Sequence, residues 1–205
     1  LLAELEASGG TVPQPGRRTV GELLDAVLEH KRARVAPRTH ADYEALVERY
    51  LRPALGHVKL ARLTPAHIQR CYDALLARGV VRQAAAAHAF LAMALRLARR
   101  WGWLGHLPTD RVEPPRRRRA RREVWTVDEL ARFLTCPAVR ASPYYPLWLV
   151  ALGSGCRPGE LLALRWGDID WERGLLRVRR AGQHVRGQWV ETEGKTPAAR
   201  RDVAL

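Results

Sequence analysis

An arginine run in the middle of the sequence is the feature with the clearest chemical use. Six of the seven residues at 116–122 are arginines: Arg116, Arg117, Arg118, Arg119, Arg121 and Arg122. A guanidinium group presents its N–H donors in a planar fork that matches a phosphate group. A solvated linker or a nuclear-localisation patch can have the same composition. With a nucleic acid as partner, we interpret the run as a strap across the phosphate backbone.

The charge of the whole chain favours such a partner. Its 205 residues include 35 Lys+Arg against 21 Asp+Glu, which gives a formal charge of +14 and an isoelectric point of about 11.0. Only three of the basic residues are lysines, and the arginine excess suits phosphate contacts, although genome base composition can produce the same bias. We therefore predict a polyanionic partner, double-stranded DNA before RNA, because no RNA-binding signature is present.

Several other classes of protein are disfavoured. The three cysteines lie far apart without a CxxC pair, and the seven histidines show no metal-ligand spacing, so we expect no disulfide framework, no metal and no cofactor. A reducing cytoplasm fits this cysteine pattern. No apolar run approaches the roughly 20 residues of a membrane span, so no membrane partner is expected. The sequence begins without Met, which leads us to expect that it starts within a longer protein.

The first half is expected to be a helical bundle. Apolar residues recur at helical spacing in four stretches, and capping or proline signals open most of them. Thr19 to Glu22 is a capping box, Thr39 is expected to cap the second helix, and Thr64 precedes a proline at the first position of the third. The predicted helices cover residues 19–34, 39–53, 64–79 and 82–101. Pro53 and Gly56 are expected to end the second.

The second half changes from helices to strands. A capping box, Thr126 to Glu129, starts a new domain, and the all-apolar stretch 146–152 predicts a buried helix. A short helix is predicted over 158–164, and strands over 175–178, 188–190 and 201–205. We divide the chain into a leading linker at 1–18, a helical domain at 19–105, a basic linker at 106–123 and a final domain at 124–205.

The segment from Gly155 to Asp170 carries the most specific motif. A glycine turn precedes Arg157, Glu160 follows three residues later, and the stretch Leu-Arg-Trp-Gly-Asp-Ile-Asp leads into a predicted strand. This segment resembles the first active-site box of the tyrosine recombinases, the phage-integrase family of DNA strand transferases. The segment 193–205 resembles the lysine hairpin of that family and the strand that follows it. The helices of the first half are similar to its core-binding domain.

The resemblance implies an α+β fold, in which a four-helix, SAM-like core-binding domain precedes the N-terminal part of a mixed α/β catalytic domain with a β-hairpin. Residues 1–18 resemble the end of an upstream arm-binding domain and its linker. Arg157 would bind the scissile phosphate, and Lys195 would protonate the leaving 5′ hydroxyl. Glu160, one helical turn from Arg157, would orient it. The DNA contacts implied in the helical domain are Arg38, Thr39 and Arg82.

Two parts of the family pattern have no counterpart in the expected place. The family needs a His-x-x-Arg box and a nucleophilic tyrosine after the first arginine, whereas His67-Ile-Gln-Arg70 and all five tyrosines precede Arg157. Three of those tyrosines lie on apolar stripes and are expected in the core. We therefore expect this chain to be the DNA-binding segment of a recombinase and to be inactive alone. For the full-length enzyme, the resemblance implies a reaction without metal or ATP and a homotetramer on two DNA sites. A catalytically silent DNA-binding protein is the alternative.

Overall fold

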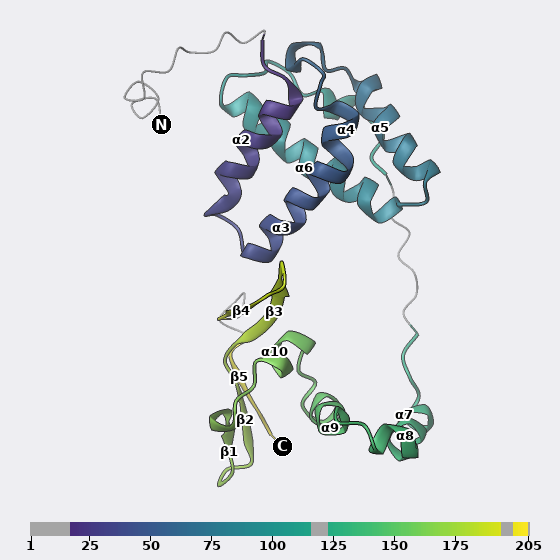
Figure 1. Ribbon diagram of the computed structural model, residues 1–205, viewed down its shortest axis with the longest axis vertical. Helices are drawn as coiled ribbons and strands as arrows, with labels where there is room; N and C mark the ends of the chain where they lie inside the picture. The colour runs from purple at the N-terminus through teal and green to yellow at the C-terminus, as the bar shows by residue number, and fades with distance from the viewer. Residues whose placement is uncertain (1–16, 116–122, 194–198, 205) are drawn as a thin grey trace. The chain divides into compact units, whose positions relative to one another are not determined.

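The chain forms two compact units, residues 1–119 and residues 120–205. The computed structural model describes residues 17–115, 123–193 and 199–204, and each unit is treated by itself (Figure 1). The first unit is helical, and the second combines helices with small antiparallel sheets. This confirms the predicted α+β class.

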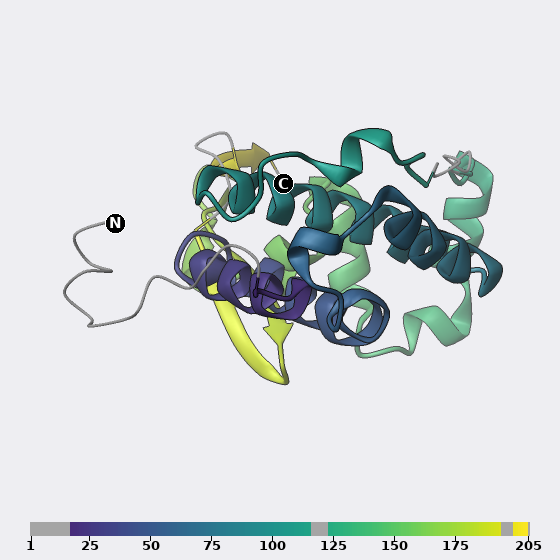
Figure 2. The ribbon, with the colours of Figure 1, turned by 90° about the horizontal axis from the view of Figure 1, so that it is seen from above.

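Helices of the first unit enclose one hydrophobic core. Its main elements are α2 (Val20–Arg32), α3 (Pro37–Leu46), α4 (Arg52–Leu55), α5 (Pro65–Ala77) and α6 (Val81–Arg100), and the same helices are seen from above in Figure 2. Short turns η2 (Leu60–Arg62) and η3 (Pro108–Arg111) complete the unit. Leu23, Leu24, Tyr72 and Phe90 are among the largest buried side chains. The core therefore draws on α2, α5 and α6, as the helical periodicity predicts.

Local capping signals place two of the helix starts correctly. Thr19 and Thr64 both accept a hydrogen bond from the backbone N–H three residues later, and in both cases the third residue reaches back to the cap. For the third helix that residue is His67, whose Nδ1 lies 2.9 Å from the Thr64 hydroxyl. In the apparent His-x-x-Arg motif at 67–70, the histidine is therefore part of a helix cap, and Arg70 lies within the same helix of the first unit.

The second predicted helix needs two corrections. Thr39 does not cap it, because Ala36 is the N-cap residue and Pro37 takes the first helical position, where its fixed φ is already suitable. Pro53 does not end it either. A π-helical turn, η1 (Val47–Leu51), connects α3 to α4, and the chain stays helical to Leu55. The changed hydrogen-bond register before Pro53 accommodates its missing N–H.

Helices of the second unit precede its strands. They are α7 (Val127–Thr135), α8 (Pro137–Arg140), α9 (Tyr145–Ser154) and α10 (Pro158–Leu162), and the turn η4 (Trp166–Asp168) follows. The predicted Thr126 capping box is present at the start of α7. The expectation of a buried helix at 146–152 is wrong, because no residue of α9 is fully buried. Leu147 and Val150 face the small core of this unit, but in the part of the chain that the structure describes Leu149 and Leu152 remain exposed.

Five strands form two separate sheets. Strands β1 (Ile169–Asp170), β2 (Leu175–Val178) and β5 (Arg201–Ala204) lie in the order β1-β2-β5, and β3 (Ala181–Val185) pairs only with β4 (Gln188–Thr192) among the described strands. All pairs are antiparallel. Arg186 and Gly187 have positive φ angles of 52° and 79°, as the tight turn between β3 and β4 requires. The hairpin therefore projects from the connection between β2 and β5 (Figure 1).

Candidate active site

Arg157 stands at the start of α10 with its side chain directed to solvent. Gly155 ends α9 in the left-handed conformation, with φ of 61°, and Pro158 takes the first turn of α10, so Arg157 becomes the N-cap residue between two helices. Its side chain is 73% exposed. A guanidinium in this position can reach a phosphate group outside the protein.

Glu160 contacts both the side chain and the backbone of Arg157. One carboxylate oxygen, Oε1, lies 2.8 Å from Nη1 of Arg157, and the other, Oε2, accepts a hydrogen bond of 2.9 Å from the Arg157 backbone N–H. The residue is buried, with only 4% of its surface exposed. The structure therefore brings together the arginine and glutamate that the motif suggested.

A second arginine, which the sequence analysis left without a role, completes this cluster. Arg201 of β5 places Nη2 at 2.9 Å from Oε2 of Glu160 and Nη1 at 3.3 Å from Oε1. Its position was predictable in part, because alternation along β5 places Arg201 on the same, more buried side as Val203. An arginine at an inward strand position needs a buried anion as partner.

These contacts change the acidity of Glu160. The hydrogen bonds from Arg201 and then from the backbone and side chain of Arg157 lower its pKa from the ordinary value of 4.5 to about 2, and burial acts in the opposite direction. The carboxylate is therefore ionised at neutral pH and keeps both guanidinium groups paired. It is an orienting group and is unsuited to act as a proton donor.

We expect Glu160→Gln to remove an acid-sensitive part of the stability of the second unit. Because the folded pKa lies below the ordinary value, this contribution is present above about pH 4.5 and is lost as pH falls through about 2. The shift corresponds to about 3 kcal/mol at neutral pH. Thermal unfolding followed by circular dichroism should show a difference between wild type and variant that shrinks from pH 7 to pH 2. A pH-independent difference would contradict the assignment, and the exposed Glu172→Gln serves as control.

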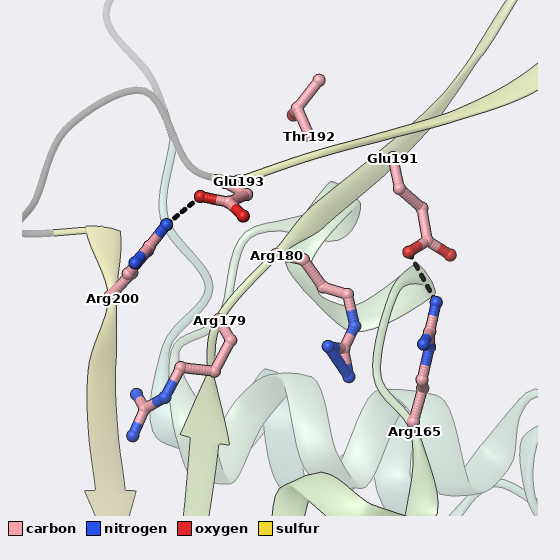
Figure 3. Close-up of a pocket in the computed structure, with 7 residues that line it drawn as sticks. All are labelled: Arg165, Arg179, Arg180, Glu191, Thr192, Glu193 and Arg200. Atoms are coloured by element: carbon pink, nitrogen blue, oxygen red, sulfur yellow. Dashed lines mark hydrogen bonds and ion pairs between the residues drawn. The ribbon is translucent and has the colours of Figure 1, made fainter.

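A polar cavity of about 390 Å³ lies near the base of the β3–β4 hairpin (Figure 3). Its charged lining residues are Arg165, Arg179, Arg180, Glu191, Glu193 and Arg200. Each arginine has a carboxylate partner: Glu191 for Arg165 at 2.8 Å, Asp168 for Arg180 at 2.7 Å, Asp202 for Arg179 and Glu193 for Arg200. The four cavity arginines are thus matched by four carboxylates, whereas Arg157 and Arg201 share the single carboxylate of Glu160 and keep one net positive charge.

Two residues that line the cavity flank the predicted lysine in the sequence. Glu193 and Arg200 bracket the segment 194–198, which contains Lys195. Lys195 lies outside the described residues, and so does the arginine run with its six members Arg116, Arg117, Arg118, Arg119, Arg121 and Arg122. Their assignments rest on the sequence.

The DNA contacts expected in the first unit are accessible to different degrees. Arg38 and Arg82 are exposed near the starts of α3 and α6, and Thr39 is half-buried within the first turn of α3. Arg38 forms an ion pair with Asp42 at 3.1 Å. The two helices are packed together, with the rings of Tyr43 and Phe90 5.0 Å apart. All three residues stay candidates for DNA contact.

The tyrosines of the first unit have structural roles. Tyr72 is buried and Tyr43 and Tyr50 pack against the same core, as expected. Within the described ranges no group of His, Cys, Asp and Glu side chains could hold a metal ion. No helix in those ranges has the length and apolarity to cross a membrane.

Comparison with known proteins finds a family match within the first unit. Residues 19–76 match the phage integrase N-terminal SAM-like domain. A XerC-like tyrosine recombinase of Caldanaerobacter subterraneus is 29% identical over 176 residues, which is 82% of this chain and 44% of that protein. The phiRv2 prophage integrase of Mycobacterium tuberculosis is 28% identical over 199 residues, 97% of this chain and 51% of that protein. The chain thus spans about half the length of these relatives.

Solved structures show the same fold. The Tn1549 transposon integrase in complex with transposon right end DNA has a TM-score of 0.78 at 19% identity, over 91% of this chain and 61% of that one. The lambda integrase tetramer bound to a Holliday junction has a TM-score of 0.71 at 21% identity, over 89% of this chain and 52% of that one. The likeness covers both units.

Proposed function

Because this chain belongs to the tyrosine recombinase family, we propose that it is the DNA-binding segment of a site-specific recombinase that integrates or excises DNA. In the whole enzyme, a tyrosine would attack the scissile phosphate and form a 3′ phosphotyrosyl bond, and the 5′ hydroxyl would leave. A second 5′ hydroxyl would then attack that bond and release the tyrosine. Because the phosphotyrosyl bond conserves the energy of the cleaved bond, neither step requires ATP.

The observation that carries this proposal is the exposed guanidinium of Arg157 on a buried, ionised carboxylate. A surface arginine that merely pairs with a neighbouring glutamate gains little, whereas here the glutamate is desolvated and the arginine is not. The arrangement keeps a positive charge fixed at the surface. It suits a group that stabilises the negative charge that builds on a phosphate in the transition state.

Two further roles follow the family pattern. Lys195 would donate the proton to the leaving 5′ hydroxyl, the general-acid role that the resemblance to the family implies. Arg38, Thr39, Arg82 and the arginine run would bind the phosphate backbone on either side of the cleavage site. We further propose that the whole enzyme assembles as a homotetramer on two DNA sites, and that it acts in the cytoplasm, where a reducing environment suits its cysteines.

A catalytically silent DNA-binding protein remains the second candidate. The five tyrosines of this chain precede Arg157, and three of them pack against the core of the first unit. The sequence encoded after Leu205 separates the two functions. A reading frame with a His-x-x-Arg box and a tyrosine supports the recombinase, and a stop codon supports the silent protein.

We expect the chain to bind duplex DNA with steep salt dependence and weak sequence preference. Replacing Arg116, Arg117, Arg118 and Arg119 together by alanine should flatten the slope of log K against log salt by up to about four units, because each phosphate contact releases condensed counterions. Fluorescence anisotropy with a labelled duplex measures this slope. Arg32→Ala is the matched control, since Arg32 already pairs with Glu29 at 3.3 Å, and it should leave the slope unchanged. An unchanged slope in the fourfold variant would refute the strap.

A further inference from the structure

The carboxylate of Glu160 is shared between two guanidinium groups that differ in exposure. Arg157 is 73% exposed, Arg201 is 32% exposed and the Glu160 side chain between them is 6% exposed. Each carboxylate oxygen receives one contact from Arg201 and one from Arg157, counting its backbone N–H. The cluster is thus layered, with the arginine of the strand inside and the arginine of the helix outside.

The backbone holds Arg201 more firmly than it holds Arg157. Arg201 is paired with Val178 in the register between β5 and β2, and Val178 is buried in the small core of the second unit. Its guanidinium also approaches the Ala199 carbonyl at 3.4 Å and the sulfur of the buried Cys156 at 3.8 Å. A side chain with several fixed acceptors has little freedom to swing toward DNA.

We propose that Arg201 is a positioning residue, which fixes Glu160 so that Arg157 presents its guanidinium to a DNA phosphate. This inference rests on the proposed function. Arg201 contacts both oxygens of the Glu160 carboxylate. The side chain of Arg157 contacts the same carboxylate through Nη1 alone. Among the described residues, the other side-chain donors of Arg157 meet no acceptor, and they can meet a phosphate.

Loss of Arg201 would leave Glu160 buried with one cationic partner. A buried carboxylate that lacks hydrogen-bond donors is destabilised and attracts the nearest donors. Arg157 would therefore turn inward and form a bidentate ion pair with Glu160. The guanidinium would then be withdrawn from the surface. Arg201 therefore influences phosphate binding through Arg157, without contact with DNA.

A double-mutant cycle on DNA affinity tests this coupling in the full chain. We expect Arg157→Ala and Arg201→Gln each to weaken binding by about 10-fold to 150-fold, the range for one hydrogen bond to a charged group. In the Arg157→Ala background, Arg201→Gln should have no further effect. Arg200→Gln is the matched control, because Arg200 neighbours Arg201 and pairs with Glu193, and its effect should combine additively with Arg157→Ala. Additive effects of Arg201→Gln would mean that Arg201 contacts DNA itself and would overturn the proposal.

A second readout is independent of DNA. Titration of the Glu160 carboxyl by carbon-13 NMR should give a pKa near 2 in the wild type, raised toward its ordinary value more by Arg201→Gln than by Arg157→Ala. Arg201→Lys keeps the positive charge but lacks the planar pair of guanidinium donors, so the Glu160 pKa should lie between those of the wild type and Arg201→Gln. This variant keeps the test valid if Arg201→Gln does not fold. An unaltered titration in the Arg201 variants would overturn the proposal. Failure of the wild type to bind DNA would instead refute the proposed function, and the titration would still decide whether Arg201 governs Glu160.

Discussion

Separating the two units is expected to lower the affinity of the chain for duplex DNA by at least a hundredfold. Residues 1–105 carry 16 basic and 9 acidic side chains, and residues 106–205 carry 19 and 12, so each half has a net charge of +7. If both halves contact phosphates, linkage makes the second binding event intramolecular. Such linkage typically raises affinity by about 10²- to 10⁴-fold over either part alone.

The cut should follow Arg122, so that no arginine is lost from the pair of fragments and the whole arginine run stays with the first. The first fragment then has 23 basic and 11 acidic side chains, a net charge of +12, and the second has 12 and 10, a net charge of +2. Fragments 1–122 and 123–205 are assayed singly and as an equimolar mixture, after circular dichroism has established that each keeps its secondary structure. The mixture should bind no more tightly than the better fragment. If one fragment alone binds as tightly as the joined chain, the two units do not hold DNA together.

Local signals in the sequence predicted the helices well. Thr19, Thr64 and Thr126 each begin a helix through contacts within three residues, and such contacts need no information from the rest of the chain. The start of α3 was placed at Thr39 because a threonine is a good cap. Pro37 begins the helix two residues earlier, because a proline at the first position competes with a nearby cap residue.

Strand pairing was less accessible to sequence reasoning. Leu175–Val178 shows clear alternation and was predicted with correct bounds, but its partners are β1 and β5. Leu175 pairs with Ala204, and the β3–β4 hairpin lies between them in the sequence. Strand β3 was missed, because Ala181–Val185 lacks alternating apolar residues. It is a strand because it pairs with β4. Long-range pairing therefore decides what the local pattern leaves open.

The candidate site shows the same division between local and long-range information. Arg157 and Glu160 lie three residues apart on one helix, so the motif alone predicted their contact. Arg201 lies 41 residues from Glu160, and the pairing of β5 with β2 brings it there. The apolar composition of α9 likewise led to the wrong prediction that the helix is buried. Burial of an apolar helix depends on which other elements of the fold cover it.

The largest effect is expected in strand cleavage by the whole enzyme. On a nicked suicide substrate with the cognate site, the longer reading frame should form a covalent protein–DNA adduct that a denaturing gel detects. Arg157→Ala should slow its formation by about 10²- to 10³-fold, the usual effect of removing one group that stabilises transition-state charge. Lys195→Ala should slow it as well, through loss of the general acid.

The nature of the leaving group separates the two roles. A substrate with sulfur in place of the bridging 5′ oxygen releases a thiolate, which needs no proton, so this substrate should restore cleavage by Lys195→Ala and leave Arg157→Ala slow. The 205-residue chain alone should give no adduct with either substrate, because its tyrosines precede Arg157 and residues that act together in catalysis lose nearly all activity when one is absent. An adduct from this chain alone would mean that one of those tyrosines is the nucleophile. The assignment of the active site to Arg157 would then be wrong.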